Sequence, residues 1–345
     1  MFSFENDYAE GACPKVLNAI VQNNSGQLPG YGMDEISLTA TALIKEKLGR
    51  EDVDVHFVTG GTQCNILAIS LLKPYEAVIS AETGHINVHE TGAVELSGHK
   101  IIPVATRDGK IRPEQIQQVL DVHTSEHLVK PKMVFIANAT ELGTVYDRFE
   151  LRDLYLFCRE HGLYLYVDGA RIGNALSATD IDLSFTDLCN SCDMFYIGGT
   201  KNGALIGEAM VIVNDDLKPD FRYYLKQNGA MMAKGRFIAE QFKALMEDET
   251  YLENAKNANI MAQALKYILR QYGIVMYVDS PSNQIFPIID NKLLSWISSS
   301  YKITEWGAYD DQHTIIRMVC SWATTKDDIQ NFYVDLADYV EKNRS

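Results

Sequence analysis

The sequence predicts an α/β protein, with a mainly parallel central sheet, helices on both faces, and a smaller C-terminal α+β domain. Apolar strand-like runs alternate with helical segments between residues 53 and 213, and this alternation is typical of repeated β-α-β units. From about residue 230 the pattern changes to long helices followed by short strands. A chain of 345 residues is long enough for one large and one smaller domain. We therefore predict an N-terminal segment (1–30), a large domain (31–245) and a small domain (246–345).

The predicted elements begin with two helices. The first spans 14–23 and starts at Pro14, a residue that suits the first turn of a helix. The second spans 34–48, because its apolar residues have helical spacing and Asp34 and Glu35 place negative charge in the first turn.

The alternating region follows these helices. Short apolar runs predict strands at 53–59, 76–80, Lys100–Val104, 132–138, 163–167, 194–197 and 209–213. Amphipathic segments between them predict helices at 60–72, 89–96, 112–123 and 151–161. The C-terminal part is predicted to hold helices at 235–246 and 251–272, strands at 274–278, 284–287 and 315–320, and a closing helix at Lys326–Lys342.

The charge and composition exclude several classes of partner. The net charge is −15, from 46 acidic and 31 basic residues, which disfavours nucleic acid and anionic membranes. The sequence contains no apolar run of about 18 residues and no recognisable signal peptide. Six scattered cysteines, with CxxC spacing only at Cys189 and Cys192, favour free thiols over a zinc site. We therefore expect a cytoplasmic protein that binds no structural metal.

Lys201 is the most informative residue. It lies in the segment 193–207, DMFYIGGTKNGALIG, where a strand-like run ends at Gly198 and Gly199 and Thr200 precedes the lysine. This is an unusual position for a solvated cation. It suits an amine that loses its proton and attacks a carbonyl, as Schiff-base lysines do. The commonest cofactor held by such a lysine is pyridoxal phosphate, which also needs an acidic residue near its pyridine nitrogen.

Asp168 supplies that acidic residue. It ends the strand-like run in LYLYVDGAR (163–171), where an unpartnered carboxylate would be costly to bury. A salt bridge to Arg171 is the structural alternative. If Asp168 instead faces the pyridine nitrogen, Arg171 is free to hold a substrate carboxylate through two parallel hydrogen bonds.

The segment VTGGTQCN (58–65) predicts an anion cradle. A strand, then Gly60, Gly61 and Thr62, then a helix places backbone N–H groups and a helix N-terminus toward a bound phosphate. The alternative is a tight turn capped by Thr62. Thr200 also has two interpretations, as a phosphate donor or as a turn hydroxyl.

His85 follows a predicted strand, in SAETGHINVHETGAVE (80–95). An imidazole there can stack on a pyridine ring or transfer protons near neutral pH. His89 lies four residues further on, but the pair lacks the glutamate of an HExxH zinc motif and a third ligand. A purely structural histidine is the alternative. Arg317 interrupts a strand-like run and is either an edge-strand arginine or a second carboxylate clamp.

Together these segments resemble the threonine aldolase and β-eliminating lyase family of fold-type-I pyridoxal phosphate enzymes. The resemblance extends from NDYAEGACP (6–14) and GYGMDE (30–35) through GGTQCN, TGHINVHETGA, VDGAR and GGTKNG to IRMVCSWAT (316–324). The order and spacing of the motifs carry it, more than any single motif. One departure is that the chain has Asn6 and Asp7 where aldolases typically carry a carboxylate-binding serine.

The resemblance implies a role for each matching residue. Lys201 would bond the cofactor, Asp168 would contact its ring nitrogen and His85 would stack on the ring. Gly60, Gly61, Thr62 and Thr200 would hold the phosphate, while Arg171 would lie beside the cofactor and, with Arg317, hold the substrate carboxylate. The family forms dimers or tetramers with shared sites, so Tyr31 is expected near a substrate in the neighbouring subunit, and Lys226 or Lys234 near its phosphate.

The resulting hypothesis is an aldolase that cleaves a β-hydroxy-α-amino acid, threonine or allo-threonine, to glycine and an aldehyde. His85, His89 or a held water would take the β-hydroxyl proton. Three alternatives remain open at this point. They are β-elimination from an aromatic or sulfur amino acid, amino transfer or racemisation, and a catalytically silent protein of the same fold.

Overall fold

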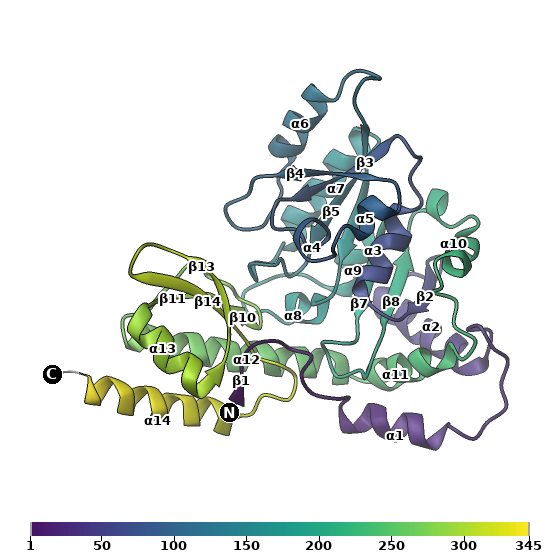
Figure 1. Ribbon diagram of the computed structural model, residues 1–345. Coiled ribbons are helices and arrows are strands. Elements are labelled where there is room, and N and C mark those ends of the chain that lie inside the picture. The colour runs from purple at the N-terminus through teal and green to yellow at the C-terminus, as the bar shows by residue number, and fades with distance from the viewer. Residues whose placement is uncertain (1, 344–345) are drawn as a thin grey trace.

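The computed structural model describes residues 2–343, and a seven-stranded sheet organises the larger part of them (Figure 1). Its strands are β2 (Asp54–Val58), β3 (Glu76–Ala81), β4 (Lys100–Val104), β5 (Lys130–Ala137), β6 (Tyr164–Asp168), β7 (Met194–Gly198) and β8 (Glu208–Ile212). The strand order is β2-β8-β7-β6-β5-β3-β4. The pairs from β4 to β7 are parallel, and β8 runs antiparallel to both of its neighbours. The predicted mainly parallel sheet is confirmed.

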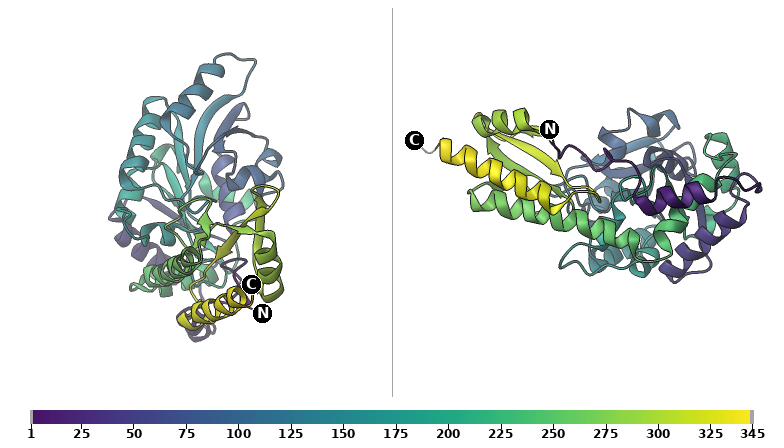
Figure 2. Two further views of the ribbon diagram at one scale, coloured as in Figure 1. Left: turned by 90° about the vertical axis from the view of Figure 1, so that its left-hand side faces the viewer. Right: turned by 90° about the horizontal axis from the view of Figure 1, so that it is seen from below.

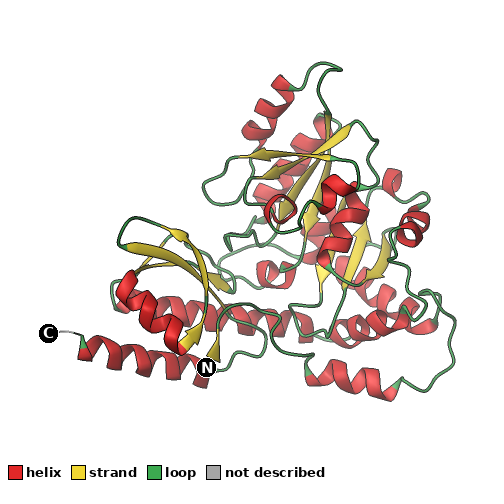
Figure 3. Cartoon of the chain, in the orientation of Figure 1, coloured by secondary structure: helices red, strands yellow, loops and turns green. Residues whose placement is uncertain are grey.

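Helices cover both faces of this sheet (Figure 3). Side chains alternate along β7, so that Phe195 and Ile197 join one buried cluster while Met194 and Tyr196 join another. The first cluster includes residues of α2 (Glu35–Leu48), α7 (Arg148–Glu160), α9 (Phe185–Asn190) and α11 (Arg236–Met246). The second includes residues of α3 (Gly61–Ile69) and α10 (Phe221–Gln227).

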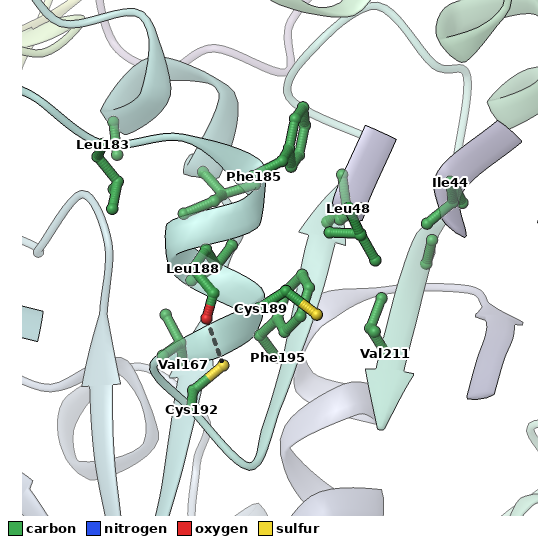
Figure 4. Packing of buried hydrophobic residues seen from close by; sticks show 14 of the residues in the cluster. Ile44, Leu48, Val167, Leu183, Phe185, Leu188, Cys189, Cys192, Phe195 and Val211 are labelled. Carbon is green, nitrogen blue, oxygen red and sulfur yellow. Dashed lines mark hydrogen bonds between the residues drawn. The ribbon is translucent and has the colours of Figure 1, made fainter. Parts of the chain in front are cut away.

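The CxxC pair belongs to the first of these clusters. Figure 4 shows Cys189 and Cys192 packed with Leu188, Val167 and Phe195, and the Cys192 thiol donates to the backbone carbonyl of Leu188 at 3.2 Å. All six cysteines are buried and unpaired. In residues 2–343 no three His, Cys, Asp or Glu side chains are grouped as metal ligands. Within the same range, no helix has the length and apolar character needed to cross a membrane.

A second, antiparallel sheet forms the C-terminal part. Its strands are β9 (Val275–Met276), β10 (Gln284–Ile285), β11 (Pro287–Asp290), β13 (Thr304–Ala308) and β14 (His313–Val319). The N-terminal strand β1 (Phe2–Ser3) pairs with β12 (Tyr301–Lys302), and α13 (Asn291–Ser300) and α14 (Lys326–Lys342) pack nearby. The long helix α12 (Thr250–Gln271) extends from the C-terminal sheet to the larger part of the molecule (Figure 2). The domain boundaries at 30 and 245 stay predictions.

The structure differs from the predicted elements mainly where they are short. Of the predicted helix at 89–96 only α5 (Ala93–Leu96) is helical, and a separate short helix that was not predicted, α4 (His85–Val88), lies before it. Thr91 and Gly92 separate them with φ angles of 53° and 75°, which a continuous helix does not allow. The sequence analysis missed α8 (Ile172–Leu176), α9, α10, α13, β1, β12, β13 and the 3₁₀ turn at Asp215–Leu217. The helices α1 (Pro14–Gln22) and α6 (Pro113–Val122) lie where they are predicted.

Candidate active site

The strand register brings the predicted site residues to one edge of the central sheet. Asp168, at the end of β6, pairs with Ala137 at the end of β5. Glu208 begins β8 opposite both Val58 and Gly198, because β8 runs in the reverse direction. The loops beyond these strand ends enclose a cavity of about 250 Å³. Its lining includes the predicted residues Gly60, Gly61, Thr62, His85, Asp168, Arg171, Thr200 and Lys201.

Lys201 has the environment expected of a reactive amine. Its Nζ lies 6.0 Å from the centre of the Tyr8 ring. Burial and the positive charge of Arg171 lower the pKa of Lys201, against the opposing charges of Asp7 and Asp168. A lowered pKa increases the neutral fraction of the amine, which is its nucleophilic form.

Asp168 is held by donors on both carboxylate oxygens. Oδ1 accepts from the hydroxyl of Tyr196 and, at 3.0 Å, from the backbone N–H of Ala170. Oδ2 accepts from Asn65 Nδ2 at 3.2 Å. The side chain is buried and lines the cavity, so these donors satisfy its oxygens where water cannot and fix its position.

His85 is oriented by a buried glutamate that the sequence analysis missed. Glu90 Oε1 lies 2.7 Å from both His85 Nδ1 and Asn65 Nδ2. Burial would lower the pKa of His85, but the bond to Glu90 and the charges of Asp168 and Glu90 outweigh burial and raise it. Asn65 Nδ2 donates to both Glu90 and Asp168, so His85, Glu90 and Asp168 belong to one polar network. The spacing of five residues from His85 to Glu90 was the only sequence signal for this contact.

The N-terminus of α3 forms the predicted anion cradle. Gly60 is extended and α3 begins at Gly61. The Gln63 side chain accepts from the Thr59 backbone N–H at 3.1 Å, but in the part of the chain that the structure describes the N–H groups of Gly61 and Thr62 have no protein acceptor. Such unpaired donors at a helix N-terminus suit a phosphate.

The glycines of this cradle have different surroundings. A Cβ atom at Gly60 would meet nothing within 4 Å, whereas one at Gly61 would lie 2.7 Å from the Tyr196 hydroxyl. Gly60 therefore leaves open space beside the helix N-terminus, and Gly61 allows close packing against Tyr196. Thr200 lines the same cavity, and its Oγ1 accepts from the Gly207 backbone N–H at 2.9 Å.

Arg171 differs from the expectation that it is free for a substrate. Its Nε and Nη2 donate to the two carboxylate oxygens of Asp7, at 2.7 and 3.0 Å. Asn283 Nδ2 donates to the same Asp7 carboxylate at 2.9 Å. Burial would raise the pKa of Asp7, but Arg171 and Lys201 lower it. Arg171 therefore pairs with Asp7 and does not form the ion pair with Asp168 that was the structural alternative.

Arg317 lies near Arg171 but does not line the cavity. Its guanidinium lies 5.4 Å from the Trp306 ring centre, and its Nη2 donates to the backbone carbonyl of Glu5 at 3.4 Å. Its buried Nε has no acceptor among residues 2–343. Burial and the charge of Arg171 lower the pKa of Arg317. Two neighbouring guanidinium groups with an unused buried donor suit an anion such as a carboxylate.

Tyr31 and His89 lie outside the cavity. Tyr31 is 46% exposed and lines a separate surface hollow with Arg222, and Lys226 Nζ lies 5.1 Å from its ring centre. His89 is exposed, with its ring 5.5 Å from that of His85. The expected roles of Tyr31 and Lys226 in a neighbouring subunit stay predictions, as does that of Lys234.

Two further carboxyl groups line the cavity, Glu141 and Glu208. Burial raises the pKa of each to about 7. Glu208 accepts from the Gly199 backbone N–H at 2.7 Å, and Glu141 accepts from that of His85 at 2.7 Å. Both could have been found by asking which acidic residues lie at the same sheet edge as Asp168. Glu141 follows a predicted strand, and Glu208 directly precedes one, after the Lys201 loop.

These residues fit pyridoxal phosphate. The cavity combines an amine with a lowered pKa, a buried carboxylate, an imidazole and a helix N-terminus with unpaired N–H groups. These are the groups that bind the aldehyde, ring nitrogen, ring face and phosphate of that cofactor.

The sequence is similar to those of known proteins. The family model for the β-eliminating lyases matches residues 4–291. The low specificity L-threonine aldolase of Pseudomonas aeruginosa is 32% identical over 346 residues, covering 96% of each chain.

Solved structures agree at the level of fold. The threonine aldolase of Leishmania major superposes with a TM-score of 0.97 at 44% identity, covering 99% of this chain and 100% of that one. A putative L-allo-threonine aldolase of Listeria monocytogenes has a TM-score of 0.71 at 17% identity, over 92% of this chain and 90% of its own, and shares the fold alone.

Proposed function

Because this chain belongs to the β-eliminating lyase family and groups with its threonine aldolases, we propose that it cleaves threonine or allo-threonine to glycine and acetaldehyde. The protein is a lyase with the fold of the type I pyridoxal phosphate enzymes. The observation that carries the proposal is the meeting of Lys201 and Asp168 in one cavity.

We propose pyridoxal phosphate as the cofactor. Lys201 would hold its aldehyde group, Asp168 its ring nitrogen and His85 a face of its ring. The phosphate would bind at Gly60, Gly61, Thr62 and Thr200, with Arg171 beside the cofactor. When bound, this cofactor supplies an electron sink for the pair released at the substrate Cα.

The remaining chemistry belongs to the chain. The lowered pKa of Lys201 increases the neutral, nucleophilic fraction of its amine, and three hydrogen-bond donors fix the position of the Asp168 carboxylate. Arg317, which does not line the cavity but lies close enough for the charge of Arg171 to act on it, would bind the substrate carboxylate. Arg171, oriented by Asp7, adds a second positive charge beside it. A carboxylate fixed in this way sets the orientation of the Cα–Cβ bond, which is how positioning contributes to rate.

The experiment follows the cofactor and the aldehyde together. The purified protein should absorb visible light as an imine, and K201A or borohydride treatment should remove that band. Acetaldehyde should appear from threonine or allo-threonine, and K201A should lower its release by more than about 10³-fold. A colourless protein would contradict the cofactor proposal. Pyruvate without acetaldehyde, from tryptophan, tyrosine or cysteine, would identify a β-eliminating lyase instead.

We also propose that the protein is a cytoplasmic homodimer or homotetramer with shared active sites. The exposed position of Tyr31 beside Lys226, away from its own cavity, supports a site completed by a neighbour. Six unpaired cysteines suit a reducing compartment.

A further inference from the structure

Glu141 lies where it can reach a substrate. It follows β5, whose last residue Ala137 pairs with Asp168, and it lines the cavity together with His85 and Lys201. The backbone N–H of His85 donates to Glu141 Oε1 at 2.7 Å, so the carboxyl group is fixed on the His85 side of the cavity. No sequence motif pointed to this residue.

The surroundings of Glu141 suit reversible proton transfer. Burial raises its pKa to about 7, and the negative charge of Asp168 acts in the same direction. Its own backbone N–H and that of His85 oppose this shift, as does the charge of His85. Glu90 lies beyond His85, on the imidazole Nδ1. A carboxyl group that titrates near neutrality can both accept and return a proton at working pH.

The histidines are less well placed for this role. Nδ1 of His85 is committed to Glu90, and the ring is expected to lie against the cofactor. His89 is exposed and does not line the cavity. We therefore propose that Glu141 is the catalytic residue that exchanges a proton with the β-oxygen of the substrate. This role rests on the aldol cleavage proposed above.

The proposed step is balanced as follows. In cleavage the Glu141 carboxylate takes the β-hydroxyl proton, the oxygen electron pair forms the carbonyl bond, and the Cα–Cβ bond breaks with its pair leaving on Cα. A proton from solvent then adds at Cα and Glu141 releases its proton to solvent, so glycine and the aldehyde together contain every atom of the substrate and the carboxylate is restored. In the reverse direction the Glu141 carboxylic acid protonates the aldehyde oxygen as the carbon–carbon bond forms.

The first test compares threonine cleavage, which requires proton transfer at the β-oxygen, with a reaction at Cα that does not. Exchange of the glycine α-proton with deuterated water needs the cofactor and Lys201 but has no β-oxygen. In E141Q the amide oxygen still accepts from the His85 N–H. We therefore expect threonine cleavage to fall about 10²-fold or more while glycine exchange stays within about threefold. E82Q, on an exposed glutamate of the neighbouring loop, is the matched control and should leave both rates unchanged.

The outcomes are distinct. If E141Q cleaves threonine as fast as the unmodified enzyme, or loses both rates equally, the proposed role of Glu141 is wrong. If the unmodified enzyme exchanges glycine but releases no aldehyde from any β-hydroxy amino acid, the aldolase function itself is wrong.

Two further measurements do not depend on that comparison. In the unmodified enzyme, threonine cleavage should decline as the pH falls below about 7, because the base becomes protonated. The residual cleavage by E141Q should lack the Glu141 part of that decline, whereas Glu208, whose pKa is also about 7, affects both proteins. Identical pH profiles would overturn the proposal. Infrared difference spectra of the cofactor-free protein across pH 7 should show carboxylic acid absorbance from both Glu141 and Glu208, and E141Q should lack the Glu141 part. Identical spectra for the two proteins would equally overturn it.

Discussion

At the scale of single residues, Glu90 determines which nitrogen of His85 is available. Its Oε1 accepts from His85 Nδ1, which leaves Nε2 as the nitrogen for any other contact. The side chain of Glu90 is fully buried, and its Oε2 has no partner among the described residues. Among the described residues, His85 and Asn65 are therefore the side chains that contact the Glu90 carboxylate. The effect of Glu90 on the pKa of His85 should be measurable.

We predict that E90Q makes His85 easier to deprotonate. The amide can still accept from Nδ1, but the negative charge that raises the pKa of His85 is lost. The His85 titration followed by NMR should move to lower pH, and kcat/KM for threonine should fall about 10- to 100-fold. E95Q, an exposed glutamate nearby, is the control. An unchanged titration in E90Q would show that Glu90 does not set the charge of His85.

Residues at strand ends could be predicted from the sequence, and their long-range partners could not. Lys201 and Asp168 each stand at the end of an apolar run followed by glycine, and parallel strands bring such ends to one edge. The pairing of Asp7 with Arg171 joins residues 164 positions apart. No local pattern marks it, so the expectation of a free Arg171 missed a partner that only the folded chain reveals.

At the scale of elements, α3 starts with two adjacent glycines that have different surroundings. The space beside Gly60 is open, while Gly61 lies against the Tyr196 hydroxyl that donates to Asp168. The same backbone turn therefore provides room for an anion on one side and packs tightly on the other. Substitutions at the two positions should have different effects.

We predict that G60A weakens cofactor binding and G61A weakens the fold. G60A keeps an extended φ that any residue adopts, so the free energy of unfolding should change by less than about 0.5 kcal/mol. Its methyl group would obstruct the cradle and raise the Kd for pyridoxal phosphate about tenfold. G61A forces Tyr196 to move and should cost about 1–3 kcal/mol. Urea unfolding of the cofactor-free protein measures the free energy of unfolding, and absorbance titration measures the Kd for pyridoxal phosphate. If G60A and G61A changed both quantities by the same amounts, the different roles assigned to the two glycines would be wrong.

Strong periodic elements were predicted well, and short ones were missed for a physical reason. α2 and α7 begin directly after Asp34 and Asp147, whose side chains cap the helices, so both starts are encoded locally. The predicted helix at 151–161 nevertheless begins three residues later than α7. The break between α4 and α5 depends on the positive φ of Thr91. Nothing in the apolar spacing of 89–96 indicates it, because threonine rarely adopts that conformation.

At the scale of the whole molecule, Tyr31 tests whether the active site is shared. The tyrosine lies outside its own cavity, so a catalytic role would require a second copy of the chain. A shared site has a consequence that a self-contained site lacks, because two differently damaged chains can then assemble one intact site.

We predict that mixed K201A and Y31A subunits recover activity. After joint unfolding and refolding in equal amounts, half the dimers would be mixed and about one quarter of all sites would carry both native side chains. Aldehyde release should therefore exceed that of either parent. Activity equal to the average of the two parents would place Tyr31 outside the partner's site.

The first residues of the chain are held by its last strands. Phe4 donates to the carbonyl of Lys302 and accepts from the N–H of Val319, and Asp7 then holds Arg171 in the middle of the sequence. During synthesis the growing polypeptide emerges from the ribosome with its N-terminus first. The N-terminal residues around Phe4 therefore cannot form these contacts until nearly all of the chain has been translated. Arg171 therefore cannot gain its final ion pair with Asp7 before the ribosome has almost finished.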